Sequence, residues 1–443
     1  MQTPTYFIKD CMRLVRQTNS YFSALFLLFT LASLQSSAQE NSPYSRYGLG
    51  DLTPGQNILN RAIGGLSSAY ADYSTVNFAN PASYSSLKIT TLDIGLDYNS
   101  RTLRDLNPPR KFGSSYLIPS YLQIGVPLSK KKNWGMAFGL RPLTRINYDI
   151  TTRTRLSGID SAAYNFMGNG GTYQASWGMA YGTKSLSIGF NAGYMFGNKE
   201  YASRLSFIND TLTYKTANAA DTTRFGGLFL NAGIQYKIKL NEKTSLRLGA
   251  HGNLAAKLNA TRNLTRATVE YSDNTGFIVV DSVYTGSDIK GDIIYPSAWS
   301  AGFMLEKENQ WMLGGEIGIA NWADYRYYGV ADNMINSWTA RLGGQWLPNF
   351  KGENYWSRVA YRLGASFGPA NIQLTKPIPQ YIFSFGAGLP VRRNVYTNQY
   401  TMINASFEVG FRGNKENDIR ENLFRLSLGL NLSDIWFNKP KYQ

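Results

Sequence analysis

Apolar and polar residues alternate with a period of two along most of the chain from about residue 89. Leu92, Ile94 and Leu96 alternate with Asp93 and Gly95, and the same rhythm returns in many later segments. A period of two places successive side chains on opposite faces of a β-strand. The segments are roughly ten residues long, which is the length that a tilted strand needs to cross a membrane.

Fourteen such segments can be counted, and the connections between them are alternately short and long. The segments are 89–98, 116–127, 134–149, 171–182, 185–197, 225–238, 244–258, 293–305, 310–320, 336–347, 357–367, 380–389, 402–411 and 423–432. An even number lets an up-and-down barrel close with antiparallel ends, and short periplasmic turns opposite long outer loops are typical of bacterial barrels. The sequence therefore predicts an all-β fold, an antiparallel transmembrane β-barrel of about 14 strands over residues 87–433. The longest loop, 259–292, is expected to form a hairpin of its own.

A soluble β-sandwich also alternates, but it would place charged residues on the face away from the core. Here the second face is mostly Gly, Ser, Ala and Asn, with occasional charges such as Arg247 and Glu316. Aromatic residues occur at the predicted strand ends, as in the interfacial girdle of a membrane barrel. They are Trp134, Tyr148, Trp311, Trp322, Trp346 and Trp356. The pattern favours the barrel over the sandwich.

Residues 1–38 are expected to be a signal peptide. A basic start is followed by an apolar stretch from Tyr21 to Leu34 and by the small residues Ser36, Ser37 and Ala38. This order is typical of export signals, and the apolar stretch is short for a membrane-spanning anchor. Cys11, the only cysteine, lies inside this segment, so we expect no disulfide and no thiol chemistry in the mature chain. The predicted location is the cell outer membrane.

Residues 39–86 lack the strand pattern and are rich in glycine. A disordered tail is one interpretation. The apolar residues Leu49, Ile58, Leu59, Ile63 and Leu66 favour a compact element that packs against something. We therefore expect an N-terminal hatch folded into the lumen. The end of the chain, 434–443, runs past the last predicted strand and is expected to be a periplasmic tail.

The formal net charge of +16 raises the question of nucleic-acid binding. The basic residues are scattered, however, and the densest run, Lys130 to Lys132, falls in a short turn. We therefore predict outer-membrane lipid rather than nucleic acid as the partner of these charges. With His251 as the single histidine and no serine–histidine–aspartate spacing around it, we expect no enzyme activity, no metal site and no cofactor.

Several short motifs resemble the FadL/TodX-type outer-membrane transporters of hydrophobic compounds. The motifs that resemble that family's hatch are Arg61-Ala62-Ile63-Gly64-Gly65, Ala69, Asp72 and Asn80-Pro81-Ala82. The run from Gly135 to Leu140 with Pro142 resembles its third strand. Tyr295-Pro296, the segment from Trp311 to Trp322, and Tyr361 to Gly364 also fit. The resemblance implies a hatch-plugged barrel for passive uptake of long-chain fatty acids or other hydrophobic small molecules, with a side exit at a break in the third strand.

Candidate ligand or gate residues follow from this resemblance: Asn80, Pro81, Ala82, Arg141, Pro142 and Arg145. The residues themselves support Pro142, because a proline cannot donate to a strand ladder and marks a gap or a bulge. Both interpretations of Pro142 stay open. Arg141 and Arg145 could pair with a carboxylate, although lumen-facing charges are more often structural.

A second function is left open by the sequence. Related plugged barrels, including a PorV-like, secretion-associated branch, serve as structural subunits of outer-membrane secretion or assembly machinery of the type IX kind. The long opening from Asn41 to Gly48 and the tail after Asp434 depart from a simple transporter. Proteins of such a machinery are therefore the alternative partners.

Overall fold

The computed structural model describes residues 42–106, 109–129, 132–156, 159–208, 214–272, 276–374, 376–391, 400–417 and 419–434. The expected signal peptide, 1–38, and residues 435–443 of the expected tail lie outside this part. The short helices are η1 (Pro43–Arg46), α2 (Ile58–Ala62), η2 (Pro81–Ser86), η3 (Trp322–Asp324) and η4 (Tyr355–Arg358). The strands are β1 (Asp51–Leu52), β2 (Thr90–Leu106), β3 (Pro109–Ser129), β4 (Trp134–Leu156), β5 (Ile159–Gly182), β6 (Leu186–Ile208), β7 (Thr216–Lys239), β8 (Thr244–Asn253), β9 (Ala256–Ser272), β10 (Gly276–Tyr295), β11 (Ala298–Lys307), β12 (Trp311–Ala320), β13 (Arg326–Tyr327), β14 (Ser337–Trp346), β15 (Ala360–Gln373), β16 (Pro377–Val391), β17 (Tyr400–Arg412) and β18 (Ile419–Asp434).

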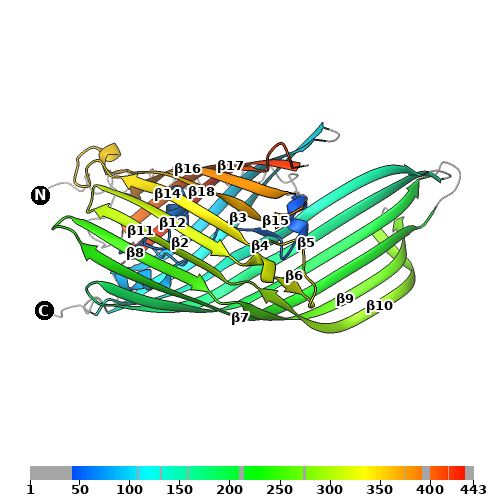
Figure 1. The fold of residues 1–443 in the computed structure, drawn as a ribbon, viewed down its shortest axis with the longest axis horizontal. Helices are drawn as coiled ribbons and strands as arrows, with labels where there is room; N and C mark the ends of the chain where they lie inside the picture. Colours follow the sequence, from blue (N-terminus) through cyan, green and yellow to red (C-terminus); the bar gives the residue numbers. More distant parts are fainter. Residues whose placement is uncertain are drawn as a thin grey trace, which may run out of the picture. The chain divides into compact units, whose positions relative to one another are not determined.

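These strands close into a fourteen-stranded antiparallel barrel, as the sequence predicts. Consecutive strands pair in antiparallel register, and β18 pairs with β2 to close the wall. β8 and β9 together form one wall strand, and so do β10 and β11, because each pair is interrupted for only two residues. The predicted number of wall strands is therefore confirmed (Figure 1).

The distribution of polarity is the reverse of that in a soluble protein. In β18, Leu426, Leu428 and Leu430 are 38–44% exposed on the outside, while Ser427 and Asn431 on the opposite face of the strand are at most 1% exposed. A wall that is apolar outside and polar inside is what a membrane barrel requires. The protein is a transmembrane β-barrel. In the described part of the chain, no helix combines the length and the apolar character needed to cross a bilayer.

The aromatic girdle is partly as expected. Trp134, Trp311 and Trp346 are exposed at the end of the barrel with the short turns, as is Trp356. For Tyr148 and Trp322 the prediction was wrong, since both are only 4% exposed. Tyr148 packs against the ring of Tyr201, and Trp322 packs against Tyr295 and Tyr325, because both side chains belong to the interior of the barrel.

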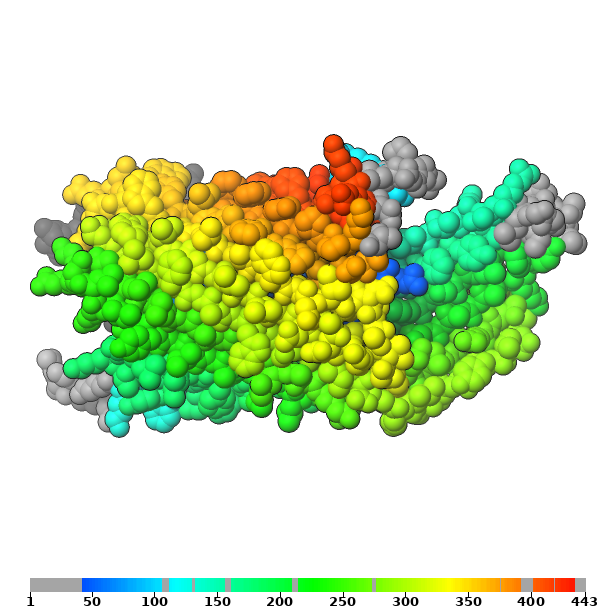
Figure 2. All heavy atoms as spheres, viewed as in Figure 1, coloured from blue at the N-terminus to red at the C-terminus, as the bar shows by residue number. Residues whose placement is uncertain are grey.

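The wall is much taller on one side. β12 and β14 have 10 residues each, about the length that spans a membrane, whereas β5 and β7 have 24. Residues 259–292 form the expected hairpin, since β9 and β10 pair with each other. The prediction that they are a loop outside the wall was wrong, because both strands continue the wall. In Figures 1 and 2 the strands from β4 to β10 extend well past the rest of the wall.

Residues 42–88 lie inside the barrel and fall into two parts. We call residues 42–56 the gap segment and residues 57–88 the lumen segment. The gap segment contributes Tyr44 and Leu49 to an apolar cluster with Trp322 and Met334. The lumen segment contains α2 and η2, and its apolar side chains pack in two further clusters against inward-facing residues such as Tyr121 and Met304.

Candidate functional site in the barrel wall and lumen

The wall has a gap between β3 and β4. These strands pair only from Leu122 opposite Leu140 down to Ser129 opposite Trp134. Beyond Leu122, β3 continues to pair with β2, and beyond Leu140, β4 continues to pair with β5. The two neighbouring strands therefore diverge on the side away from the short turns, and residues 51–54 lie in the space between them, beside Tyr116 of β3 and Arg145 of β4.

Prolines explain where the pairing stops. Pro119 on β3 and Pro142 on β4 lie just beyond the last pair, and neither has a backbone N–H for a ladder. A register shift accompanies each of them, at Gly95/Leu96 in the pairing of β2 with β3 and at Pro142/Thr144 in the pairing of β4 with β5. Pro142 therefore marks both a bulge and the edge of the gap.

The gap segment covers this opening from the lumen side. In β1, Asp51 pairs with Arg145 and Leu52 pairs with Thr144 of β4. Thr53 then donates its backbone N–H to the carbonyl of Leu143 at 3.0 Å and its hydroxyl to the carbonyl of Pro142 at 2.8 Å. Between residues 51–54, β3 and β4 only a cavity of about 10 Å³ remains.

Gly50 allows this close approach. Its φ is +105°, in a region that favours glycine, and a Cβ at this position would lie 2.4 Å from the carbonyl oxygen of Arg145. Any side chain here would therefore push the gap segment away from β4.

A cluster of charges fixes the other face of the gap segment. The carboxylate of Asp51 accepts from Arg101 at 2.8 Å and from Arg412 at 3.0 Å, and Glu421 lies 3.2 Å from Arg101. Burial alone would raise the pKa of Asp51, but the attraction of Arg412 and Arg101 and a hydrogen bond from Ser42 outweigh it and lower the pKa to about 2. Asp51 is therefore ionised at neutral pH and ties the gap segment to β2 and β17.

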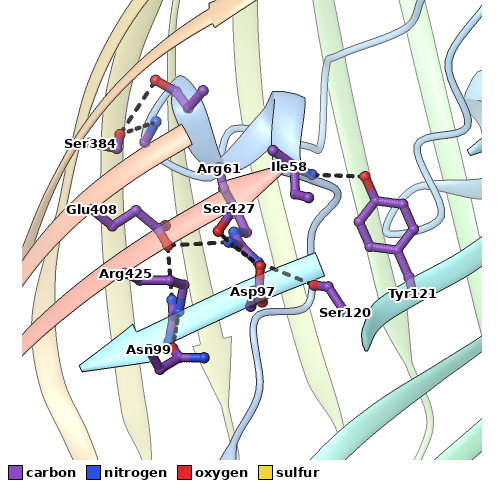
Figure 3. A network of polar contacts seen from close by, with 12 residues as sticks. Ile58, Arg61, Asp97, Asn99, Ser120, Tyr121, Ser384, Glu408, Arg425 and Ser427 are labelled. Carbon is purple, nitrogen blue, oxygen red and sulfur yellow. Dashed lines mark hydrogen bonds and ion pairs between the residues drawn. The ribbon is translucent and has the colours of Figure 1, made fainter. Parts of the chain in front are cut away.

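The lumen segment is held by a second buried cluster of charges, centred on Arg61 of α2 (Figure 3). Its guanidinium forms two hydrogen bonds of 2.9 Å to the carboxylate of Asp97 and lies 3.4 Å from Glu408. Arg425 bonds the same Glu408 at 2.9 Å. All four side chains are at most 8% exposed, so two cations and two anions form a buried, hydrogen-bonded cluster that joins α2 to the adjacent strands β17, β18 and β2.

Glu316 of β12 anchors the next turn of the lumen segment. It accepts from the backbone N–H groups of Ser67 and Ser68 at 2.7 Å each and pairs with Arg341 at 2.7 Å. His251 faces the lumen, and its Nδ1 lies 3.2 Å from the hydroxyl of Ser68. The histidine thus contacts the lumen segment at a buried position.

Amide side chains of the wall satisfy the backbone carbonyls of the lumen segment. The donors come from β6, β7 and β18. They are Asn191 to Phe78 at 3.3 Å, Asn231 to Ala79 at 3.0 Å, Gln235 to Ser68 and Tyr70 at 3.0 Å each, and Asn431 to Ser74 at 2.8 Å. Inward glycines allow the close approach, since a Cβ at Gly249 would lie 2.0 Å from the carbonyl oxygen of Ser68. These contacts surround the lumen segment on nearly all sides.

The structure separates the sequence-predicted site residues into two groups. Asn80 caps η2 by accepting from the N–H of Ala82 at 3.1 Å, and it donates to the carbonyl of Ser68 at 2.6 Å. Pro81 and Ala82 are buried against Gly189. This group lies in the lumen segment, away from the gap, and its contacts are those of an anchor.

The second group, Arg141, Pro142 and Arg145, lies on β4 at the gap. Arg141 donates to Gln174 at 3.0 Å and to the carbonyl of Gly55 at 3.2 Å, and its guanidinium lies 4.8 Å from the ring centre of Phe78. Within the described residues Arg141 has no carboxylate partner. Arg145 stacks on Tyr116 of β3 at 5.0 Å, across the gap.

Sequence reasoning missed the charges that hold residues 42–88. Asp51, Asp97, Glu316 and Glu408 were not singled out, although Glu316 was noted as a charge on the small-residue face. A charged residue in register with small inward-facing ones is the signal that could have identified them, because such a charge needs a partner in the lumen. No group of His, Cys, Asp and Glu in the described part of the chain could hold a metal ion.

Two cavities lie on opposite sides of the lumen segment. A large one of about 1550 Å³ opens among the short turns and is lined by Tyr70, Lys184 and Lys243. A smaller one of about 220 Å³ is lined by Gln56, Gly64 and Arg412. In this conformation the lumen segment separates them.

Comparisons with known proteins agree with this architecture. The family model described as BamG matches residues 21–443. No curated protein sequence matches the chain. Among solved structures, a Pseudomonas aeruginosa FadL homologue is similar with a TM-score of 0.58 and 11% identity, over 87% of this chain and 98% of that one.

Two further solved structures show the same similarity. The CymD monoaromatic hydrocarbon channel has a TM-score of 0.55 and 14% identity, over 88% of this chain and 99% of that one. The Pseudomonas putida toluene transporter TodX has a TM-score of 0.56 and 15% identity, over 87% and 100%. At such low identities the likeness concerns the fold, and it confirms the predicted FadL-type barrel.

Proposed function

The chain belongs to the BamG family, and on this premise we propose that it is an outer-membrane barrel for the passive uptake of hydrophobic compounds. The observation that carries the proposal is the gap between β3 and β4, which only the gap segment closes. A continuous wall would force an apolar molecule through the aqueous periplasm, whereas a side opening leads it directly into the hydrocarbon layer. Solved barrels of similar fold are named as channels for toluene and monoaromatic hydrocarbons.

In this proposal the gap segment is the gate. Its closure rests on the two-residue pairing of β1, two hydrogen bonds from Thr53 and the ion pairs of Asp51. Lys199 and Tyr201 of β6 add hydrogen bonds to the carbonyls of Gly48 and Arg46. Releasing these contacts opens the wall beside Pro142 without disturbing the lumen segment. The anchoring contacts of Asn80, Pro81 and Ala82 support a fixed role for that part of the hatch.

Long-chain fatty acids are the ligands that the gap residues suit best. Arg141 is a half-buried cation beside the opening, held by an amide and a carbonyl, and a carboxylate would be a stronger partner for it than either. Arg145, on the other side of the bulge, stacks on the ring of Tyr116 of β3. The hydrocarbon part of such a ligand would pass between β3 and β4 into the membrane.

A reversible disulfide tests the gate. Leu52 and Thr144 are direct partners in an antiparallel pair, a geometry within the range that a disulfide requires. Leu52→Cys combined with Thr144→Cys, in a chain whose Cys11 is replaced by serine, should lock the gap segment to β4. We expect uptake of radiolabelled oleate into cells to fall to the level of a deletion strain when the disulfide forms, and to recover on reduction.

The matched control is a disulfide in the continuous wall, Ala387→Cys with Ala405→Cys, which are partners in β16 and β17. This bond crosses no opening, so uptake should stay at the wild-type level. If the deletion strain itself takes up oleate and toluene normally, the uptake function is wrong. If the wild type transports but the locked gap variant transports equally well, the gate is wrong.

A structural subunit of an outer-membrane secretion or assembly complex is the second candidate. The observation that favours it is the extent to which the lumen segment is fixed, through the buried charge cluster of Arg61 and the amide contacts of the wall. A permanently closed lumen suits a scaffold better than a channel. Loss of surface-exposed proteins in the deletion strain, with normal uptake, would support this function and exclude the first.

A further inference from the structure

We propose that the outer edge of β10 is a docking site for an extended polypeptide strand of a partner protein at the cell surface. We call residues Gly276–Asp288 the β10 edge. In the described part of the chain these residues pair only with β9, so one side of the strand has no neighbour. The proposal concerns an interaction surface and does not depend on transport.

The β10 edge lies far outside the membrane. β8 and β11 are in register with the 10-residue strand β12, and β9 and β10 begin beyond them, after short breaks at Leu254 and Pro296. This is the side away from the short turns, which the rule for bacterial barrels assigns to the cell surface. The edge is therefore surrounded by water rather than by lipid. Figure 1 shows β9 and β10 in the part of the wall that extends past the short strands.

The first part of the edge, Phe277 to Val280, is an unbroken apolar run in spite of this position, and Val283 follows after Asp281 and Ser282. Phe277, Ile278, Val279 and Val280 are 41–56% exposed, and Val283 is 74% exposed. Register shifts leave Val280 and Val283 without a partner on β9, so these two residues are extra residues of bulges. An exposed apolar patch in water, on an element with unpaired backbone groups, marks an interaction site.

A second open edge of the same wall provides the contrast. Beyond Asn147, whose backbone bonds Ser42 and Ser45 of the gap segment, β4 pairs only with β5 among the described residues, so its residues 148–156 also form an edge. Thr151, Thr152, Arg153, Thr154 and Arg155 are all exposed there. Charged and polar residues are how proteins keep a free edge from pairing. The β10 edge lacks this protection from Phe277 to Val280.

An extended polypeptide strand is the occupant that fits this edge. The chain's own β13 already pairs with the same strand, where Arg326 and Tyr327 lie antiparallel to Ile294 and Ile293. An incoming strand would continue this ladder along the β10 edge, gaining main-chain hydrogen bonds and contacts with Ile278 and Val283.

A second copy of this chain does not fit. Two copies in one membrane are related by an axis along the membrane normal, and strands of such barrels tilt by about 35–45° from it. Two β10 edges would then cross at a steep angle instead of running side by side, and no ladder could form. The partner is therefore a different protein, exposed at the cell surface.

Thiol labelling tests the proposal. In a chain with Cys11 replaced by serine, Val283→Cys provides a single thiol on the β10 edge, and Thr152→Cys provides a matched thiol on the β4 edge. A membrane-impermeant maleimide is applied to intact cells and to the purified protein in lipid vesicles. We expect labelling of Val283→Cys in cells to be about a tenth of that in vesicles, because the partner strand covers the thiol in most of the barrels. Labelling of Thr152→Cys should be equal in both.

Two lysine substitutions distinguish a bound strand from other molecules that could protect the thiol. Ile278→Lys with Val280→Lys should restore labelling of Val283→Cys in cells, because charge on an edge opposes strand addition. Equal labelling of Val283→Cys in cells and vesicles would overturn the proposal. So would protection in vesicles, which points to this chain itself, or protection that survives the lysines, which points to a surface glycan. Heat-modifiable migration in gels verifies that each variant is a folded barrel.

Discussion

The gap segment and the lumen segment are neighbours in the chain, but the barrel holds them by different means. Residues 57–88 are tied to strands around the whole circumference by amide donors, by Glu316 and by the buried cluster of Arg61. Residues 42–56 pair as a strand with β4 alone, through a two-residue ladder extended by Thr53, while Asp51 forms ion pairs with β2 and β17 and two side chains of β6 bond the segment's carbonyls. We expect this segment, which closes the wall, to leave more readily than the lumen segment.

This contrast separates two events that a single hatch would combine. Opening the lumen requires breaking contacts to many strands at once, including charges that would remain buried and unpaired. Opening the wall requires breaking the short ladder with β4, the ion pairs of Asp51 and the hydrogen bonds from β6, without unpairing the cluster of Arg61. The four changes below test this contrast.

Arg61→Leu should have the largest effect. It leaves Asp97 and Glu408 buried with one cation fewer, and breaking a buried ion cluster costs about 3–5 kcal/mol. We expect the free energy of unfolding in urea, measured in lipid vesicles by tryptophan fluorescence, to fall by this amount. Lys184→Leu removes an exposed cation from a turn and should change it by less than about 0.5 kcal/mol. Equal effects would contradict the role of the cluster.

Gly50→Ala should release the gap segment and leave the barrel intact. The new Cβ would meet the carbonyl of Arg145, and the positive φ adds strain of about 1–3 kcal/mol. We expect tryptic cleavage after the exposed Arg46 to accelerate more than tenfold, with no change in the urea midpoint of the barrel. Gly276→Ala is the control, since its φ is also positive but no atom lies within 4 Å of the added Cβ. Unchanged cleavage would show that β1 does not hold the segment.

Acid should weaken the gap segment through Asp51. Its pKa is lowered from 3.8 to about 2 in the folded protein, so its ion pairs stabilise the closed state by roughly 2 kcal/mol above about pH 4. This contribution is lost as the pH falls from about 4 to about 2. Pepsin should therefore cleave the gap segment of the wild type more slowly than that of Asp51→Asn at pH 4. At pH 2 the two cleavage rates should be equal. A ratio independent of pH would exclude Asp51 as the anchor.

Thr53→Val should have the smallest effect. It removes the hydroxyl that donates to Pro142 and keeps the backbone bond to Leu143, which corresponds to a loss of about 1 kcal/mol. Amide exchange of residues 42–56 should accelerate about fivefold, while that of residues 57–88 stays the same. Thr154→Val, at an exposed position of β4, the strand to which Thr53 bonds, is the control. Faster exchange in both segments would mean that they open together.

The strands of the membrane band were predictable because alternation along one strand is a local property. Leu426, Leu428 and Leu430 show it without any knowledge of their neighbours. The tall side of the wall was not predictable from alternation. Strands such as β9 lie outside the lipid there and carry Thr, Asn and Arg instead of an apolar face. Its residues form strands through long pairing with each other, which a local pattern does not reveal.

The candidate site was predictable in part, for a similar reason. Pro142 indicated a break because the missing N–H is a property of the residue itself. That the break is one edge of a gap depends on Pro119 on another strand, and that it is closed depends on Asp51, far away in the sequence. Tyr148 and Trp322 were misassigned because an aromatic residue at a strand end can face the lumen as well as the membrane interface.

The most direct test of the account compares two disulfides in one uptake assay. Leu52→Cys with Thr144→Cys locks the gap segment, and Ser85→Cys with Ser187→Cys, whose hydroxyl oxygens are 2.9 Å apart in the native chain, locks the lumen segment to β6. Oleate uptake should stop in the first variant until the disulfide is reduced, and should continue in the second. Uptake that survives the first lock and stops with the second would contradict the claim that the gap segment is the gate.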